Sequence, residues 1–294
     1  MSSRCKFVGA LGISKKVIAV GVFSTSDEPI RKKPKVDLEV NCHKSIMKEL
    51  LDKCVSESYT LTDQDITTVL RLCNEDEHFR KALCEQSVSS DGTNTSPLYW
   101  LKLNEFSDEH TTELLSLCNE YDDIRKALCE QSVFSDGEKK SPIYELTLNE
   151  FSNEHITELL SLCKDYDDIR KALCEQSVFS DDGKISPIYR ITQKSLSAGH
   201  IPTVLDLCTK HDDFRIAMCE QSVLGDGAKI SPIYRLTEKS LREGHITTVL
   251  DLCTKHDDLR KAICEQSVFS DGGKSSPIYW LIEKSSGNEP ITLL

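Results

Sequence analysis

The sequence lacks long hydrophobic runs: no stretch of 18 or more apolar residues occurs in its 294 residues. A helix that crosses a membrane needs about 20 of them, so we expect no membrane association. Positive charge is also scarce, because 36 Lys and Arg stand against 48 Asp and Glu, for a formal net charge of −12. An acidic chain has no general attraction for nucleic acid, so we expect none as a partner.

The chain also lacks the short motifs of common catalytic sites. It contains no glycine-rich phosphate loop, no paired zinc-binding histidines of the metalloprotease type and no serine elbow of the hydrolase type. Signals for β-strands are nearly absent, since few alternating runs occur. With 38% hydrophobic and 29% charged residues, the chain still has enough apolar mass to build a core.

What the sequence does contain is an uninterrupted 45-residue repeat. The segment Cys-Glu-Gln-Ser-Val begins at Cys84, Cys129, Cys174, Cys219 and Cys264. The segment Ser-Pro-Leu/Ile-Tyr begins at Ser96, Ser141, Ser186, Ser231 and Ser276. A fixed period of this length is typical of solenoids and related arrays, and a tandem array of near-identical units argues against an enzyme.

One unit, residues 141–185, predicts two or three helices and a turn. Ser141 and Pro142 are typical of a helix start, and the first helix should reach about residue 152. Apolar residues at helical spacing predict a second helix over 154–163. Residues 169–178 form either a third helix or the end of one long bent helix, and 180–184 read as a turn.

A unit this small cannot bury its apolar face alone, so neighbouring units must stack. We therefore predict an all-α repeat solenoid of stacked helix-turn-helix units. Three regions are expected: a basic, non-repetitive segment at 1–40, a divergent capping unit at 41–90, and tandem repeats with a truncated C-terminal cap at 91–294.

Over residues 91–294 the repeats resemble ankyrin repeats. Asp226-Gly227 precedes Ser231-Pro232-Ile233-Tyr234, and Gly244-His245 precedes an apolar helix, in the family's order of turn, first helix and second helix. The period is 45 rather than 33, with Ser and Tyr replacing the family's Thr and His. The resemblance implies a protein-binding scaffold without a cofactor. Divergent arrays of this kind also look like those of bacterial effectors, which would place the chain in a host cell's cytoplasm or nucleus.

Cysteines at an 11-residue spacing, such as Cys163 and Cys174, could form a zinc or redox pair. Zinc sites normally show much closer cysteine spacing, so we favour buried packing residues. Reduced cysteines fit the cytoplasm. The recurrent histidine (His110, His155, His200 and His245) is interpreted as a structural hydrogen bond between a helix start and a neighbouring loop, since four identical catalytic sites in tandem would be unusual.

Two further repeated features are interpreted structurally. The recurrent arginine, represented by Arg125, follows Asp122 and Asp123 and should form ion pairs within or between units. The repeated Glu130-Gln131-Ser132 segment predicts hydrogen bonds between stacked units.

Partner binding in a solenoid is expected where the copies differ. The position after Ser-Pro-x-Tyr differs most clearly, and we define its residues as the variable row: Trp100, Glu145, Arg190, Arg235 and Trp280. Trp and Arg are enriched at binding hot spots, so this row is the predicted protein-binding site of a monomer. The alternative is that these positions vary only because they are exposed to solvent, with the tryptophans covering the ends of the solenoid.

The N-terminal segment carries two weaker signals. Residues 31–35 (Arg-Lys-Lys-Pro-Lys) resemble a short nuclear localisation signal or a solvated linker. Residues 17–23 are apolar and would pack on the first unit or form a poor signal-peptide core. The competing function is an enzyme or toxin activity within residues 1–60, with the repeats as a targeting arm.

Overall fold

The computed structural model describes residues 48–53, 60–102, 106–148 and 151–285. The chain divides into two units, 1–42 and 43–294, and every described residue belongs to the second. The predicted segment 1–40, with its basic run at 31–35 and its apolar run at 17–23, lies outside the described residues.

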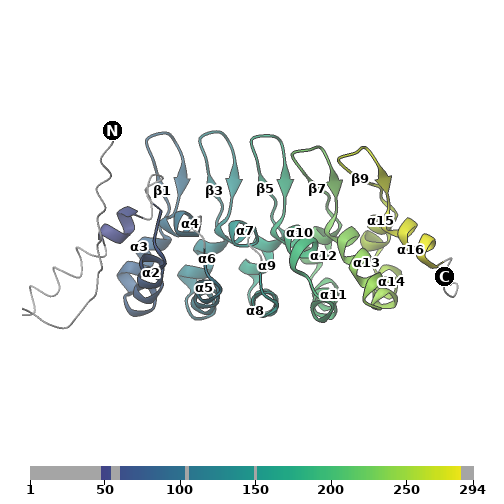
Figure 1. Ribbon diagram of the computed structural model, residues 1–294, viewed down its shortest axis with the longest axis horizontal. Helices are drawn as coiled ribbons and strands as arrows, with labels where there is room; N and C mark the ends of the chain where they lie inside the picture. The colour runs from purple at the N-terminus through teal and green to yellow at the C-terminus, as the bar shows by residue number, and fades with distance from the viewer. Residues whose placement is uncertain (1–47, 54–59, 103–105, 149–150, 286–294) are drawn as a thin grey trace, which may run out of the picture. The chain divides into compact units, whose positions relative to one another are not determined.

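The described chain repeats a set of three helices, so the helical part of the predicted fold class is confirmed (Figure 1). The first helices are α4 (Pro97–Lys102), α7 (Pro142–Leu146), α10 (Pro187–Arg190), α13 (Pro232–Arg242) and α16 (Pro277–Ser285). The second helices are α2 (Asp63–Glu75), α5 (Asp108–Glu120), α8 (Asn153–Asp165), α11 (Ile201–Lys210) and α14 (Ile246–Lys255). The third helices are α3 (Glu77–Cys84), α6 (Asp122–Cys129), α9 (Asp167–Cys174), α12 (Asp212–Cys219) and α15 (Asp257–Cys264).

Helix starts follow the local sequence. Ser141 caps α7 by accepting a hydrogen bond from the backbone N–H of Tyr144 at 3.3 Å, with proline at the first helical position. Ser152 caps α8 in the same way, through the N–H of His155 at 3.2 Å. The first helix of this unit ends earlier than predicted, at Leu146, and the Thr147 hydroxyl bonds to the Tyr144 carbonyl at 2.7 Å.

A single extended residue separates the second helix from the third, which decides between the two sequence interpretations. Tyr166, between α8 and α9, has φ −128° and ψ 119°. It ends one helix and begins the next, and its N–H still bonds to the Leu162 carbonyl at 2.8 Å. Each complete unit therefore has three helices, and its second and third helices are not one bent helix.

The expectation of an all-α unit needs a correction, because short strands lie between the third helix of one unit and the first helix of the next (Figure 1). They are β1 (Ser87–Val88), β2 (Asn94–Thr95), β3 (Ser132–Val133), β4 (Lys139–Lys140), β5 (Ser177–Val178), β6 (Lys184–Ile185), β7 (Ser222–Val223), β8 (Lys229–Ile230), β9 (Ser267–Val268) and β10 (Lys274–Ser275). They form a 10-stranded antiparallel sheet in sequence order.

The sheet joins neighbouring units as well as the two arms of each hairpin. Ser177 pairs with Ile185 inside one hairpin, and Lys184 pairs with Val223 of the next. Two-residue strands show no alternating pattern, so a period-two search of the sequence does not find them. The predicted turn over 180–184 is confirmed as the tip of such a hairpin.

Stacking of the units creates one long apolar core. Second helices contact second helices and third contact third, for example α5 with α8 and α6 with α9. Leucines and isoleucines such as Leu159 and Ile169 are fully buried there. A second, smaller apolar cluster lies between the hairpins and the first helices, and it is formed by Tyr144, Ile185, Tyr189, Ile230 and Tyr234. Among the described helices, none has the length and apolar character needed to cross a bilayer.

The hairpin tips generate a stability prediction. Asp182 has φ 63°, where four other hairpins carry glycine at the equivalent position with φ between 79° and 89°. Asp182→Gly should therefore raise the free energy of unfolding by about 0.5–1 kcal/mol, because a side chain is strained in this conformation. Asp181→Gly, one residue earlier, should lower it, since Asp181 Oδ1 accepts the Gly183 N–H at 3.1 Å. Urea denaturation of both variants tests the opposite signs, and a loss of stability in Asp182→Gly would contradict the argument.

Candidate functional site

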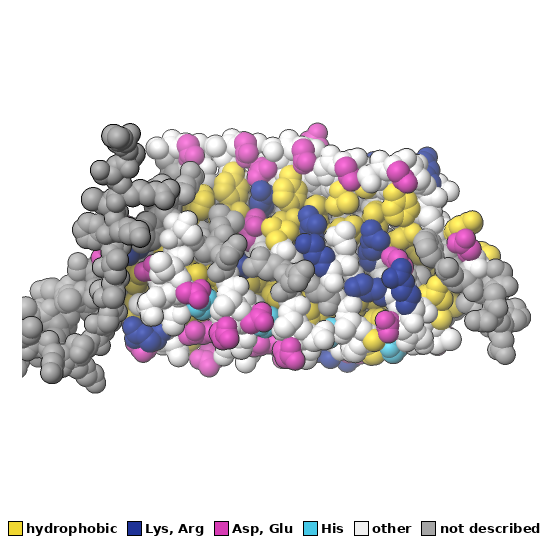
Figure 2. Space-filling view, in the orientation of Figure 1, with side chains coloured by type: hydrophobic (Ala, Val, Ile, Leu, Met, Phe, Trp, Pro, Cys, Tyr) yellow, Lys and Arg dark blue, Asp and Glu magenta, His cyan; other side chains and the backbone are white. Residues whose placement is uncertain are grey.

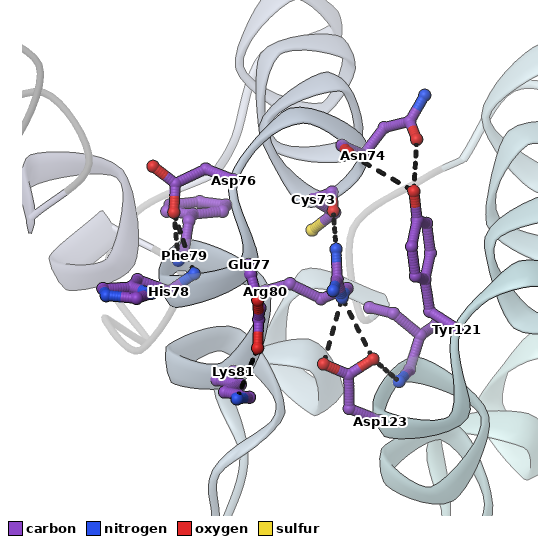
Figure 3. Close-up of polar contacts among 11 residues, drawn as sticks. Cys73, Asn74, Asp76, Glu77, His78, Phe79, Arg80, Lys81, Tyr121 and Asp123 are labelled. Carbon is purple, nitrogen blue, oxygen red and sulfur yellow. Dashed lines mark hydrogen bonds and ion pairs between the residues drawn. The ribbon is translucent and has the colours of Figure 1, made fainter.

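An arginine of the third helix holds each pair of neighbouring units together (Figure 3). The Nε of Arg80 donates to both carboxylate oxygens of Asp123, in the next unit, at 3.0 Å, and Nη1 donates to the Cys73 carbonyl at 2.9 Å. The guanidinium carbon lies 3.9 Å from the centroid of the Tyr121 ring. Tyr121 in turn donates its hydroxyl hydrogen to Asn74 Oδ1 at 2.8 Å. The Arg80 cation, whose side chain is 12% exposed, thus contacts three groups on two units, and Tyr121 extends the link to Asn74.

The same arginine contact recurs along the array, which confirms the predicted ion pairs both within and between units. Nε donates to the next unit's aspartate in the pairs Arg125–Asp168 (3.1 Å), Arg170–Asp213 (3.2 Å) and Arg215–Asp258 (2.8 Å). Burial would raise the pKa of Asp258, but its hydrogen bonds with Arg215 and the Leu259 N–H outweigh this and hold it below the usual value. The Asp258 carboxylate is therefore ionised at neutral pH.

Glutamine side chains add a second repeated link. Nε2 donates to the backbone carbonyl of the glutamine 45 residues later in the pairs Gln86–Gln131, Gln131–Gln176, Gln176–Gln221 and Gln221–Gln266, at 3.2–3.4 Å. The predicted hydrogen bonds between stacked units are confirmed for this residue.

The recurrent histidine forms the third link. Its predicted structural hydrogen bond is confirmed at three positions, but the partner lies on the preceding unit's second helix and not in a loop. Ser107 donates its N–H to Nδ1 of His110 at 3.4 Å, which leaves the ring proton on Nε2. Nε2 lies 2.9 Å from the Thr67 hydroxyl of the preceding unit, and that hydroxyl donates to the Asp63 carbonyl. His155 with Thr112 and His200 with Thr157 repeat the contact at 3.0 and 3.1 Å.

The fourth histidine breaks this pattern. Pro202 occupies the position of the partner threonine, so His245 has no hydroxyl to meet there. A pocket of about 240 Å³ lies at this place between α11 and α14 and is lined by Pro202, Leu205, Asp206, His245 and Leu252, among others. The two second helices still contact each other, and the pocket lies where the histidine–threonine hydrogen bond of the other boundaries is missing.

The cysteines behave as packing residues. Cys73, Cys118, Cys163, Cys208 and Cys253 are buried, and the ten described cysteines are all free. Burial raises the pKa of the Cys163 thiol to about 12, so it is protonated at neutral pH. Across the described residues, no cluster of three or more His, Cys, Asp or Glu side chains is arranged to hold a metal ion.

The variable row lies on the first helices, and its four described side chains are half-buried rather than fully exposed. Trp100 donates its Nε1–H to the Thr95 hydroxyl at 2.9 Å. Glu145 accepts the Tyr99 hydroxyl hydrogen at 3.2 Å, and Arg190 Nη2 donates to the Tyr144 hydroxyl oxygen at 3.3 Å. Arg235 differs, since Nη1 pairs with Glu238 of its own helix at 3.3 Å. The Trp280 side chain lies outside the described residues.

Two ionisable groups near the row have shifted pKa values. Burial raises the pKa of Glu145, and the Tyr99 hydroxyl and the charges of Lys140 and Lys102 only partly oppose it. Burial also lowers the pKa of Lys102 to about 8, against the pull of Glu145. Later units carry the buried threonines Thr147, Thr192 and Thr237 at the position of Lys102, so Lys102 is a charged residue in a place that favours a neutral one.

The face around the row combines an apolar band with a local excess of positive charge. Figure 2 shows yellow side chains beneath the hairpin tips and dark-blue ones over α10 and α13. The sequence identified one variable position per unit, which is basic at Arg190 and Arg235, and it did not identify Lys194 and Lys239, which are 45 residues apart. Their spacing was a usable signal, because the two lysines occupy one repeat position just as the row does.

Comparisons with protein-family models, with curated proteins and with solved structures find no match to this chain.

The arginine links generate a stability prediction. Arg125→Ala should lower the free energy of unfolding by about 2–3 kcal/mol, because the Arg125 side chain is only 9% exposed and its loss leaves Asp168 unpaired. Arg260→Ala is the matched control: this side chain is 55% exposed and its described ion pair is with Asp257 of its own helix, so we expect a loss below about 1 kcal/mol. Equal losses in urea denaturation would show that the contact between units contributes nothing.

The buried carboxyl of the row generates a pH prediction. Glu145→Gln keeps an oxygen that can accept the Tyr99 hydrogen bond but removes the ionisation. A raised pKa in the folded state means that ionisation costs stability, and this cost is absent below the unfolded pKa of about 4.3. The variant should therefore be more stable than the parent at pH 7, with the gain vanishing near pH 4. Melting temperatures across pH, with exposed Glu120→Gln as control, measure this; a pH-independent difference would refute it.

Proposed function

We propose that the chain is a protein-interaction scaffold whose partner lies along the first helices and hairpins. The observation that carries the proposal is the contrast between repetition and variation on one molecule. The arginine and glutamine links recur from unit to unit, whereas Trp100, Glu145, Arg190 and Arg235 differ in size and charge at one repeated position. A shared scaffold requires sameness, and the irregular surface of a partner requires variety.

The electrostatics of the row support the same proposal. Glu145 is half-buried although burial raises its pKa, and Lys102 is buried although burial lowers its pKa to about 8. Neutral side chains would be more stable at these places, as Thr147 and Thr192 are at the position of Lys102. Residues that cost stability commonly serve binding or activity.

The resemblance to ankyrin repeats gives further support, because it implies a protein-binding array with a turn before each Ser-Pro-x-Tyr segment. The hairpins occur at that place, while the third helix is a departure from the family's two-helix unit. The alternative, an activity within residues 1–60, falls almost wholly outside the described residues, and no described observation favours it.

The test is affinity capture from lysate followed by titration of each captured protein in purified form. The row variant Trp100→Ala/Glu145→Ala/Arg190→Ala/Arg235→Ala should bind at least tenfold more weakly than the parent. The control variant Lys126→Ala/Lys171→Ala/Lys261→Ala changes three exposed positions of the third helices at the same 45- and 90-residue spacings. It should bind like the parent.

Circular dichroism must first show that both variants keep the parent's helix content. A row variant that binds every purified partner as tightly as the parent would place binding elsewhere on the chain. Failure to obtain any partner that binds in purified form would refute the scaffold proposal.

A further inference from the structure

We propose that the segment of the first-helix face formed by Arg190, Lys194, Arg235, Lys239 and Arg242 is the docking site for an acidic, extended protein segment, with Arg190 and Arg235 binding its carboxylates. We call these five residues the basic patch. The inference rests on the proposed function and adds to it the chemistry and the position of the partner.

The basic patch carries uncompensated charge. Its two acidic neighbours on α13 and at its end are Glu238 and Glu243, so five cations face two carboxylates. Glu238 is shared between Arg235 at 3.3 Å and Arg242 at 2.6 Å. Within the described part of the chain, the remaining three cations bond to neutral oxygens only.

Those neutral contacts hold the cations in place without neutralising them. Arg190 donates to the Tyr144 hydroxyl, Lys194 to the Leu148 carbonyl at 3.4 Å, and Lys239 to the Leu196 carbonyl at 2.9 Å. Each contact crosses to the preceding unit. A cation fixed by neutral partners is oriented in advance for an incoming anion.

Buried polar atoms in and beneath the patch also lack partners. The buried Nε atoms of Arg190 and Arg235 have no described hydrogen-bond partner, and neither does the hydroxyl of Tyr189, which is 0% exposed. In the two preceding units the equivalent tyrosine bonds to the row residue of the next unit, but Arg235 turns to Glu238 instead. A guanidinium has five N–H donors and suits a carboxylate particularly well.

The patch stands out against the rest of the chain, whose net charge is −12. Figure 2 shows magenta side chains gathered over the lower part of the face near α5 and α8, whose first turns hold Asp108, Glu109 and Glu154. These acids repel a long polyanion that extends beyond the patch. A short acidic protein segment contacts only the positive charge of the patch and does not reach these acids. A protein segment is therefore favoured over nucleic acid or a membrane as the occupant.

Repeat geometry sets the spacing of the acids. Packed helices lie about 8–10 Å apart, and an extended chain advances about 3.1–3.3 Å per residue. Carboxylates that meet Arg190 and Arg235 should therefore be about three residues apart. The half-buried Leu224 and Phe179 beside the second apolar cluster favour apolar residues between or beside the acids.

The experiment pans a random 12-residue phage-displayed peptide library on the full chain. The best peptide is then labelled with fluorescein and titrated by fluorescence anisotropy. We expect the selected peptides to be enriched in Asp and Glu, and Arg190→Glu/Arg235→Glu to weaken binding at least tenfold. Replacing the acids of the peptide by Asn and Gln should have a similar effect, as should 500 mM salt.

The chain itself offers the control and a precedent for folding. Lys210→Glu/Lys255→Glu reverses two charges, 45 residues apart in the same two units, at the ends of the second helices, and it should leave binding within twofold. The array already accommodates a glutamate in the row. Glu145 accepts a hydrogen bond from the Tyr99 hydroxyl, at the place where Arg190 donates one to the Tyr144 hydroxyl. Arg190→Ala/Arg235→Ala provides a second variant should the charge reversal fail to fold.

Several results would overturn the inference while leaving the scaffold proposal standing. The first is that the selected peptides are not enriched in acidic residues. The second is that Arg190→Glu/Arg235→Glu binds the acidic peptides as tightly as the parent does. The third is that no peptide is selected although the captured partners still depend on the row. Binding only of phosphoserine versions of the peptides, or tighter patch-dependent binding of a 20-nucleotide single strand, would also overturn it, in favour of phosphate. If the captured partners also ignore the row, the scaffold proposal fails as well.

Discussion

The contact on which the whole array depends is the arginine that reaches from one unit to the aspartate of the next. No unit has enough core of its own, so stability comes from what lies between units. The arginine side chain is 7–12% exposed at that boundary, where it pairs with a half-buried carboxylate and stacks on Tyr121 or Tyr166 in two of the units. The arginine and the aspartate that it meets recur at four boundaries between described units.

This arrangement separates support from recognition. All three helices of each unit contribute to the apolar core, and the second and third helices also carry two of the repeated polar links. The residues of the variable row lie on the half-buried side of the first helices. Variation in the row is tolerated because each row residue needs only one polar contact with its surroundings, through an oxygen or N–H that several side chain types can provide. Glu145 and Arg190 show this: one accepts from a tyrosine hydroxyl and the other donates to it.

Much of this architecture could be read from the sequence because its signals are local. The repeat, the serine caps, the amphipathic second helix and the links at Arg125 and Gln131 all followed from residue type and spacing. The strands could not be found, since two-residue strands pair across units. Nor could the break between helices, where Asp76, Tyr121 and His211 take the same extended backbone with no common cap. The row was located, but its half-burial and its tyrosine contacts depend on neighbours 46 residues away.

Pro202 makes one boundary between units different from the other three. Three boundaries between units have a histidine–threonine contact in addition to the arginine and glutamine links, and the boundary between α11 and α14 has an open pocket instead. An array whose units are equally bonded unfolds cooperatively from either end. An array with one weaker boundary bends and separates at that boundary first. The basic patch spans this same boundary. A segment bound to both Arg190 and Arg235 would therefore hold the two units together and stabilise the boundary between them.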